Sequence, residues 1–541
     1  MPTKCFIWIV TTGILFFACR GRNSGKEEGV AAGELVSYNF DIRPILSDKC
    51  FACHGPDANK RQAGLRLDDP KSAFQALEDN PSAFALIPGK PKSSEVYLRI
   101  TASDTSLLMP PPSSHLAKLT PEEIALIGKW IRQGAKYEEH WAFTVPRKPE
   151  IPAVKNKDWP SNEIDRFVLA GIEAAGLQPN EPADKERLLK RLCFDLTGLP
   201  PSLSLMESFD GSEASYSKTV DQLLSSPAYG EKMSVHWLDI ARYADSYGYQ
   251  DDGYRTQWPW RDWVIHSFNQ NMPYDRFVTW QLAGDLLPDP TMEQLLATGF
   301  NRNHKITEEG GVIPEEYRVS YVSDRTDLFG KAFLGITMEC ARCHDHKYDP
   351  VSQKDYFSLF AFFNNVNEVG IESVIGGPET YAKKPYMEIS RHDIDSILTF
   401  VNKPDTNRLI VSVMDDKPEK RKTYLLVRGE YDAHGEEVFP GTPGKILGFN
   451  TNYPKNRLGL SQWLFDRNNP LTARVYVNIL WQEFFGTGIV KTTGDFGMQG
   501  ELPSNPRLLD WLAVDFRENG WDIKRLVFCL PAVVGGQPRK I

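Results

Sequence analysis

Cys50-Phe51-Ala52-Cys53-His54 is the stretch of sequence that decides the fold of the first part of this chain. Two thiols and an imidazole within five residues can attach a c-type haem, because the thiols add across its vinyl groups and the imidazole binds its iron. A structural zinc site needs four ligands, and neither a second cysteine pair nor a histidine pair follows closely. The motif therefore predicts haem c on Cys50 and Cys53, with His54 as an iron ligand.

A second copy of the pattern, Cys340-Ala341-Arg342-Cys343-His344, lies 290 residues further along. It predicts a second haem on Cys340 and Cys343, with His344 on the iron. The alternative is a mononuclear metal site that adds His346 as a fourth ligand. The sequence does not choose a sixth ligand for this second haem among three candidates, which are His346, His304 and His236.

The first haem has a candidate sixth ligand in Leu108-Met109-Pro110-Pro111-Pro112. Met109 follows His54 by 55 residues, on a segment that the prolines stiffen. A thioether ligand raises the reduction potential of a haem relative to bis-histidine ligation. We expect Met109 to bind this iron, and His115 is the second candidate.

The first residues have the pattern of an export signal. Lys4 precedes a mostly apolar run at 6–18, which is too short to cross a bilayer as a helix. Ala18-Cys19 resembles a lipoprotein cleavage site, so residues 1–19 are expected to be a lipoprotein signal peptide and Cys19 the lipidated residue. Residues 20–35 are expected to form a flexible tether. These features predict a lipoprotein that is anchored to a membrane on the periplasmic or cell-surface side; the alternative is an ordinary signal peptide that is cut slightly later.

Composition narrows the class of partner. The 541 residues are 41% hydrophobic and 25% charged, the balance of a folded globular protein, and their net charge is −9. Nucleic acid is excluded as a partner, because binding it requires a basic face. No phosphate-binding loop, dinucleotide fingerprint or esterase motif is present. The expected partner is a redox protein or a respiratory acceptor.

The periodicity of apolar residues predicts a mainly α fold. A small helical cytochrome c-like domain is expected at 36–137. It closes with an amphipathic helix that Thr120, Pro121 and Glu123 begin and Gly134 ends. A linker at 138–156 leads to a larger helical domain at 157–366, a mixed segment at 367–440 with strands near 409–414 and 423–428, and a C-terminal helical domain at 441–541.

One further cluster is a weak candidate for catalysis. His236, Asp239 and Arg242 repeat at helical spacing, and Asp245 follows. His236, Asp239 and Asp245 could form a polar pocket or an acid/base pair. The structural alternative is a buried ion-pair network with solvated loop acids, so the sequence leaves open whether the chain is an enzyme.

At these residues the chain resembles the planctomycete-type cytochrome c family, whose members are large exported proteins with three blocks. The resemblance rests on long motifs that cover nearly the whole chain after the signal peptide. The motifs of the first block are Phe40–Leu46, Cys50–Gly55, Met109–Pro112 and Trp130-Ile131. Those of the second are His236–Asp245, Trp260–Trp263, Gln281–Pro288 and Cys340–Pro350, and those of the third are Asn456–Leu460, Pro470–Val475 and Leu508–Ala513.

The resemblance implies haem binding and electron transfer in the first block, and it suggests a link to the oxidative use of polysaccharides, with a glycan as a possible substrate. Two alternatives are an exported oxidoreductase with its active site in the middle domain, and a structural or glycan-binding surface protein with a metal clip. After residue 524 the family continues further than this chain. We therefore expect a truncated last domain whose final helix, with Leu526, Val527, Phe528 and Leu530, has no partner.

Overall fold

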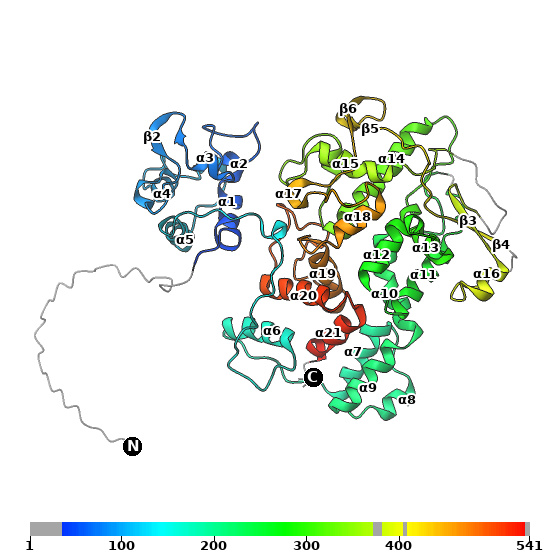
Figure 1. The fold of residues 1–541 in the computed structure, drawn as a ribbon. Helices are drawn as coiled ribbons and strands as arrows, with labels where there is room; N and C mark the ends of the chain where they lie inside the picture. Colours follow the sequence, from blue (N-terminus) through cyan, green and yellow to red (C-terminus); the bar gives the residue numbers. More distant parts are fainter. Residues whose placement is uncertain (1–34, 251, 372–380, 404–407, 536–541) are drawn as a thin grey trace, which may run out of the picture.

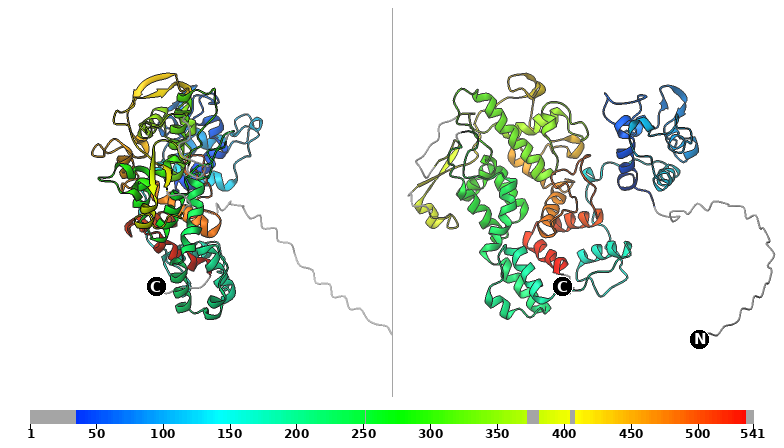
Figure 2. Two further views of the ribbon diagram at one scale, coloured as in Figure 1. Left: turned by 90° about the vertical axis from the view of Figure 1, so that its right-hand side faces the viewer. Right: turned by 180° about the vertical axis from the view of Figure 1, so that it is seen from behind.

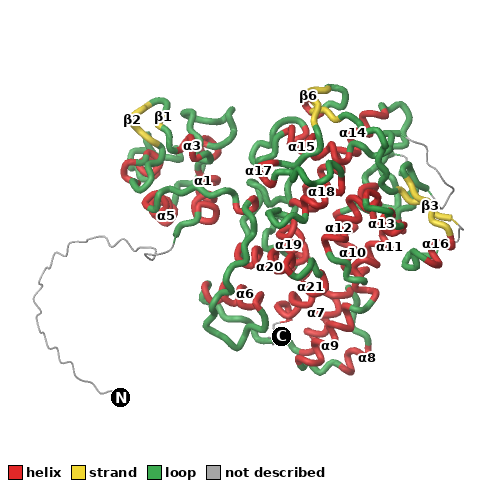
Figure 3. The backbone as a smooth tube through the Cα atoms, viewed as in Figure 1, coloured by secondary structure: helices red, strands yellow, loops and turns green. Residues whose placement is uncertain are grey.

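A computed structural model describes residues 35–250, 252–371, 381–403 and 408–535 (Figure 1). The expected signal peptide, Cys19 and all but the last residue of the expected tether lie outside this range. The fold is mainly α, as predicted, and the described residues include three small two-stranded antiparallel sheets (Figure 3). Within the described residues no helix has both the length and the apolar character needed to cross a membrane.

The first domain is a small helical unit with its own core. Thr120 and Glu123 form the predicted capping box at the start of its last helix, and Trp130 on that helix is 2% exposed at the centre of the core. The hairpin of β1 and β2 was not predicted. The elements are η1 (Tyr38–Ile42), α1 (Arg43–Lys49), α2 (Phe51–His54), α3 (Pro70–Ala73), β1 (Ala76–Leu77), β2 (Asn80–Phe84), η2 (Pro91–Ser93), α4 (Glu95–Ile100), η3 (Pro112–Ser114) and α5 (Pro121–Arg132).

The rest of the chain forms a larger helical body, and the first domain lies beside it (Figures 1 and 2). The segments expected at 157–366, 367–440 and 441–541 contribute to one continuous hydrophobic core. The helices of the body up to the second cysteine motif are η4 (Trp141–Phe143), α6 (Glu163–Ala174), α7 (Lys185–Thr197), α8 (Leu203–Ser208), α9 (Glu213–Leu224), α10 (Pro227–Ile240), α11 (Trp258–Asn269), α12 (Tyr274–Ala283), η5 (Gly284–Leu286), α13 (Met292–Ala297), η6 (Thr298–Arg302), α14 (Pro314–Phe329), η7 (Gly330–Leu334) and η8 (Glu339–Arg342).

The mixed segment supplies the strands of the body. β3 (Tyr386–Ser390) pairs with β4 (Arg408–Ser412), and β5 (Thr423–Leu426) pairs with β6 (His434–Val438). Both strands predicted from the sequence are therefore confirmed, β4 and β5. The remaining helices are α15 (Gln353–Phe363), α16 (Arg391–Ser396), η9 (Val427–Gly429), α17 (Gly444–Leu447), α18 (Arg457–Leu464), α19 (Thr472–Phe485), α20 (Pro506–Glu518) and α21 (Ile523–Gly535).

The expectation that the final helix lacks a partner is wrong. α21 packs against α19, α7 and α6, and Leu526, Val527 and Leu530 are 3%, 0% and 1% exposed. Phe528 is half-buried against the same core. The apolar face of α21 is thus covered by helices that precede it in the chain, which the sequence comparison with longer relatives did not reveal.

Candidate functional site

The first cysteine motif lies on one helical turn that continues α1. The amide of Cys50 donates to the carbonyl of Leu46 at 2.8 Å, and the amide of His54 donates to the carbonyl of Cys50 at 2.8 Å. Both thiols and the imidazole therefore emerge from the short helix α2. Gly55 ends this turn, and a Cβ atom there would lie 2.3 Å from the carbonyl oxygen of Phe51, so no larger residue fits without a shift of the backbone.

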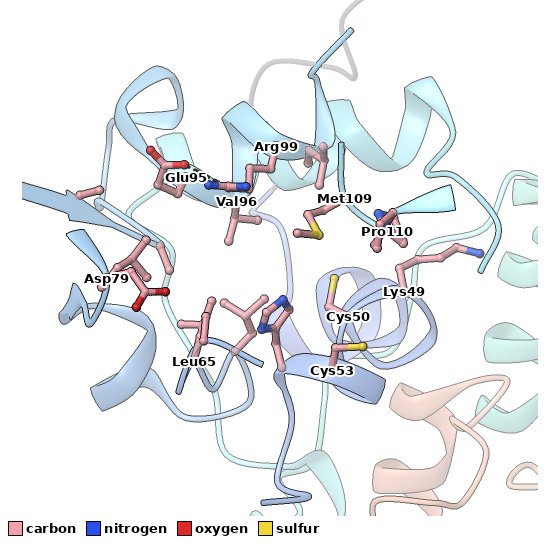
Figure 4. A pocket seen from close by; sticks show the side chains of 18 of the residues that line it. Lys49, Cys50, Cys53, Leu65, Asp79, Glu95, Val96, Arg99, Met109 and Pro110 are labelled. Carbon is pink, nitrogen blue, oxygen red and sulfur yellow. Dashed lines mark hydrogen bonds and ion pairs between the residues drawn. The ribbon is translucent and has the colours of Figure 1, made fainter. Parts of the chain in front are cut away.

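These side chains line a cavity of about 330 Å³. Met109 enters it from the opposite side, and its sulfur and the thiol of Cys50 point towards the same space (Figure 4). Most of the remaining wall is apolar, with a few charged groups. The apolar lining consists of Ala63, Leu65, Leu67, Leu77, Ala83, Ala85, Val96, Ile100, Pro110, Pro111 and Leu116, and the charged lining of Lys49, Glu78, Asp79, Glu95 and Arg99.

Burial keeps the key groups of this cavity in their neutral forms. The pKa of His54 is lowered, mainly by burial, with the backbone of Gln62 opposing the shift and Arg99 adding to it. Burial also raises the pKa of Cys50 to about 12. The Nδ1 atom of His54 is buried without a hydrogen bond of good geometry. A neutral imidazole and two thiols around an apolar cavity are the donor set that a c-type haem requires, so the residues fit this group.

The two candidates for the sixth ligand lie in different places. Met109 is half-buried, lines the cavity, and is held by a hydrogen bond from its amide to the carbonyl of Arg99 at 3.2 Å. His115 is exposed in a left-handed conformation (φ 58°) and is not part of the cavity wall. The structure therefore brings Met109, and not His115, to the space that Cys50, Cys53 and His54 enclose.

Comparison with known families gives a match for the first domain and for two later segments of the chain. Residues 50–113 match the model described as planctomycete cytochrome C, residues 163–368 match a protein of unknown function (DUF1549), and residues 456–530 match a second protein of unknown function (DUF1553). The chain has the layout of a planctomycete-type cytochrome c. No curated protein and no solved structure is similar enough to the chain to give a match. The match over residues 50–113 indicates haem binding and electron transfer for the first domain.

The second cysteine motif of this cytochrome c differs from the first in its exposure. Cys340, Cys343 and His344 are all exposed, on and directly after η8. The imidazole of His344 is oriented by a contact of 2.7 Å between its Nδ1 and the carbonyl of Asp345, which leaves Nε2 as the free ring nitrogen. The described residues form three further cavities, two beside His236 and one between the first domain and the larger body, and none of the four cavities includes these three residues. The donor set for covalent attachment is present at the second motif. Its three side chains are exposed and are not enclosed by an apolar wall like the one around the first motif.

The three histidines considered as sixth ligands at the second motif have distinct surroundings. His304 is 1% exposed, and its Nε2 lies 3.3 Å from Nη2 of Arg325. His346 is also buried, and its Nδ1 accepts a hydrogen bond from the amide of Asp349 at 2.8 Å. His236 is half-buried and lines a cavity of about 500 Å³ that extends to Glu339, the residue before Cys340. Of the three, His236 alone lines one of the four cavities.

The alternative four-ligand metal site is not assembled. His346 faces inward, whereas Cys340, Cys343 and His344 are exposed. Across the described ranges of the chain, no three His, Cys, Asp or Glu side chains are grouped closely enough to hold a metal ion.

The weak catalytic candidates are separated by the fold. His236 lies at the cavity just described, whereas Asp239 and Asp245 are exposed and outside the four cavities. Asp245 accepts a hydrogen bond from the hydroxyl of Tyr243 at 2.6 Å. Asp327 lines the same cavity as His236, and the sequence did not predict it as a site residue. In the sequence, Asp327 is only one of several acidic residues on the helix before the second motif, which is too common a pattern to indicate a site.

Proposed function

We propose that this chain is an exported electron-transfer protein, held at a membrane by lipid on Cys19, whose first domain carries haem c on Cys50 and Cys53. The cavity that places both thiols, His54 and Met109 around one space supports this proposal. Bound there, the haem supplies one-electron redox chemistry. Cys50 and Cys53 would hold it covalently, and His54 and Met109 would supply the imidazole and the thioether to its iron.

The protein residues around the site control its potential and its access to water. The apolar wall lowers the local dielectric, and the Met109 thioether favours the reduced state relative to a histidine ligand. Lys49 and Arg99 are the cations of the cavity wall that the carboxylates of a haem would meet, and both already form ion pairs, Arg99 with Glu95 at 3.3 Å and Lys49 with Asp48 at 2.5 Å.

The proposed route for electrons between the two motifs crosses the cleft between the first domain and the larger body. Phe51 and Ala52, which separate the two attachment thiols, line a cleft of about 960 Å³ together with residues 347–350, directly after the second motif. Lys347 and Asp57 bridge the cleft with an ion pair at 2.8 Å. This arrangement supports electron exchange between the first haem and a group on the second motif.

The second motif is the proposed site of a second haem, attached to Cys340 and Cys343 with His344 on the iron. The exposed donors and the free Nε2 of His344 support attachment. Such a haem would have a larger exposed surface than the first. The electrons then pass to a redox partner or a respiratory acceptor, in keeping with a role in exported polysaccharide oxidation that the family resemblance suggests.

Haem stoichiometry tests the proposal. The full chain is matured in a host that assembles c-type cytochromes, and covalent haem is measured by pyridine haemochrome absorbance and by mass. We expect two haems in the native chain, one after Cys50→Ser with Cys53→Ser, and one after Cys340→Ser with Cys343→Ser. A single haem that survives only the second pair of substitutions restricts the proposal to the first domain, and no covalent haem overturns it.

A second candidate function is an exported oxidoreductase whose middle domain acts on a substrate. The cavity at His236 favours it, because a substrate site needs a concave space with polar groups close to a redox group. The first haem then serves as the outlet for electrons.

A further inference from the structure

The cavity at His236, called the middle cavity below, is formed where three helices meet the start of the second motif. Its volume of about 500 Å³ lies within the range of small-molecule sites. One part of its wall is apolar and the other is charged. The apolar residues are Ile240, Leu328, Ala332 and Ile479. The polar ones are His236, Arg242, Asp324, Asp327, Lys331, Glu339 and Thr493, and Gly494 completes the lining.

Helical periodicity explains why the polar groups converge. Asp324, Asp327 and Leu328 lie on one face of α14 at spacings of three and four residues, and Lys331 continues this face in η7. His236 and Ile240 lie four residues apart on the facing helix α10. Both faces are thereby directed at one space, and α19 contributes Ile479 as a further wall.

The two cations of the middle cavity already have anionic partners. Arg242 forms an ion pair with Asp324, and Lys331 forms one with Glu339. Arg242 lies two residues after the end of α10, in a left-handed conformation (φ 58°) that non-glycine residues rarely adopt. The Nε and Nη2 atoms of Arg242 are buried and have no hydrogen-bond partner among the described residues, so they can donate to a ligand.

Asp327 is the charged group of the cavity without a cationic partner. Its Oδ1 accepts a hydrogen bond from the hydroxyl of Tyr356 at 3.0 Å. Burial raises the pKa of Asp327 to about 7, with smaller contributions from Glu339 and Asp324 and opposing ones from the Tyr356 hydrogen bond and Arg342. The other charged or titratable groups that face the cavity are His236, Arg242 and Lys331.

This arrangement selects a class of ligand. An anion would meet three carboxylates, those of Asp324, Asp327 and Glu339, against two cations that both already form ion pairs. A porphyrin would cover the polar side of the wall with carbon and would give the two unpartnered nitrogens of Arg242 no acceptor, which is unfavourable for buried polar groups. A small neutral molecule with several hydroxyl groups fits both parts of the wall, because its hydroxyls can bond to the charged side and its C–H surface can pack on the apolar side.

We propose that the middle cavity binds a neutral, hydroxyl-rich small molecule of the sugar class, and that Asp327 accepts a hydrogen bond from one of its hydroxyl groups. This site is independent of the number of haems that the chain carries. It lies beside Glu339, so a bound ligand is next to the second motif.

The test compares matched sugars on the full haem-loaded chain. D-glucose, D-galactose and D-xylose are the neutral probes, and D-glucuronate is the anionic counterpart of glucose. Binding is measured by saturation-transfer NMR and by calorimetry at millimolar sugar. We expect at least one neutral sugar to bind, and glucuronate to bind more weakly than glucose. Absence of binding by all the neutral sugars, or tighter binding of glucuronate, overturns the proposal.

Two substitutions localise the binding. Asp327→Asn should weaken the neutral sugar about tenfold, because a hydrogen bond to a charged acceptor contributes more than one to a neutral acceptor. Affinity in the native chain should rise as pH increases through about 7, where Asp327 ionises, and this dependence should vanish in the variant. Asp239→Asn, at an exposed acid of the same helix as His236, is the control and should leave affinity unchanged. Equal affinity of the native chain and the Asp327 variant places the ligand elsewhere and overturns the assignment.

A last measurement separates a sugar site from a haem ligand. His236→Ala should leave the optical and electron paramagnetic resonance spectra of the haem-loaded chain unchanged. Loss of a low-spin signal in this variant identifies His236 as an iron ligand, gives the middle cavity to a haem, and overturns the proposal.

Discussion

At the scale of single residues, Met109 is the proposed determinant of the redox centre in the first domain. It lines the same cavity as His54, while the competing His115 is exposed outside it. A thioether and an imidazole on opposite sides of an iron give a low-spin centre of raised potential. The chemistry of the site thus depends on one side chain carried by a proline-rich loop.

Replacing this thioether should change the spectrum without detaching the haem. Met109→Ala removes the proposed axial ligand but leaves Cys50 and Cys53 in place. We expect loss of the methionine–iron charge-transfer band and a lower reduction potential, measured by absorbance spectroscopy and redox titration. His115→Ala is the matched control and should match the native chain. If instead His115→Ala changes the spectrum and Met109→Ala does not, the assignment of the ligand is reversed.

At the scale of elements, the capping box sets where the closing helix of the first domain begins. The Thr120 hydroxyl accepts from the amide of Glu123 at 3.2 Å, and the Glu123 carboxylate accepts from the amide of Thr120 at 2.7 Å. Thr120→Ala should lower the free energy of unfolding of this domain by about 1 kcal/mol. Urea unfolding followed by haem absorbance measures it, and Thr120→Ser should retain most of the stability. Equal stability of the alanine variant would contradict a role for the cap.

A buried ion triad joins separate elements of the larger body. Glu368, after α15, accepts from Arg325 on α14 at 2.5 and 2.6 Å and also pairs with Arg302 of η6. All three side chains are at most 2% exposed. The two arginines outweigh the effect of burial and lower the pKa of Glu368 to about 2. Because the folded state favours the ionised form, this stabilisation is present above about pH 4.5 and is lost as pH falls towards 2.

Removing the charge of Glu368 should therefore be costly. Glu368→Gln leaves two buried guanidinium groups without an anion and should lower the free energy of unfolding by about 3–5 kcal/mol at neutral pH. The acid-induced loss of stability between pH 4.5 and 2 should be smaller in this variant. Denaturant unfolding across pH measures both effects. Glu436→Gln, which breaks an exposed pair with Lys354, is the control and should change stability little. A neutral-pH effect no larger than that of the control would contradict the argument.

At the scale of the whole molecule, the first domain and the larger body face each other across the cleft that Lys347 and Asp57 bridge. The lipid on Cys19 is proposed to hold this pair of bodies at a membrane. Cys19→Ser should move the protein from the membrane fraction to the soluble fraction after cell fractionation, while haem content stays the same. Continued association of the variant with membranes would show that another feature anchors the chain.

Local features of the fold were predictable because they depend on neighbouring residues. The capping box at Thr120, α14, α19 and α20, and the strands β4 and β5 all have a signal within a few residues of themselves. The first cysteine motif was predictable for a related reason, since the haem chemistry prescribes the spacing of its thiols and its histidine. The ligand role of Met109 stays a prediction, and the structure places this residue in the wall of the same cavity.

Only the tertiary structure decided the features that combine distant segments. The partner of α21 comes from α6, α7 and α19, so no local pattern could show that its apolar face is covered. The middle cavity brings His236 to Asp327 from another helix, and the exposure of Cys340 depends on what packs around η8. By itself the sequence determined the chemistry of the haem attachment and the class of fold, because both are encoded in short spacings. Packing between distant segments decides which cysteine motif is enclosed and which acid is buried. Burial in turn shifts the pKa of the enclosed groups, as it does for Asp327.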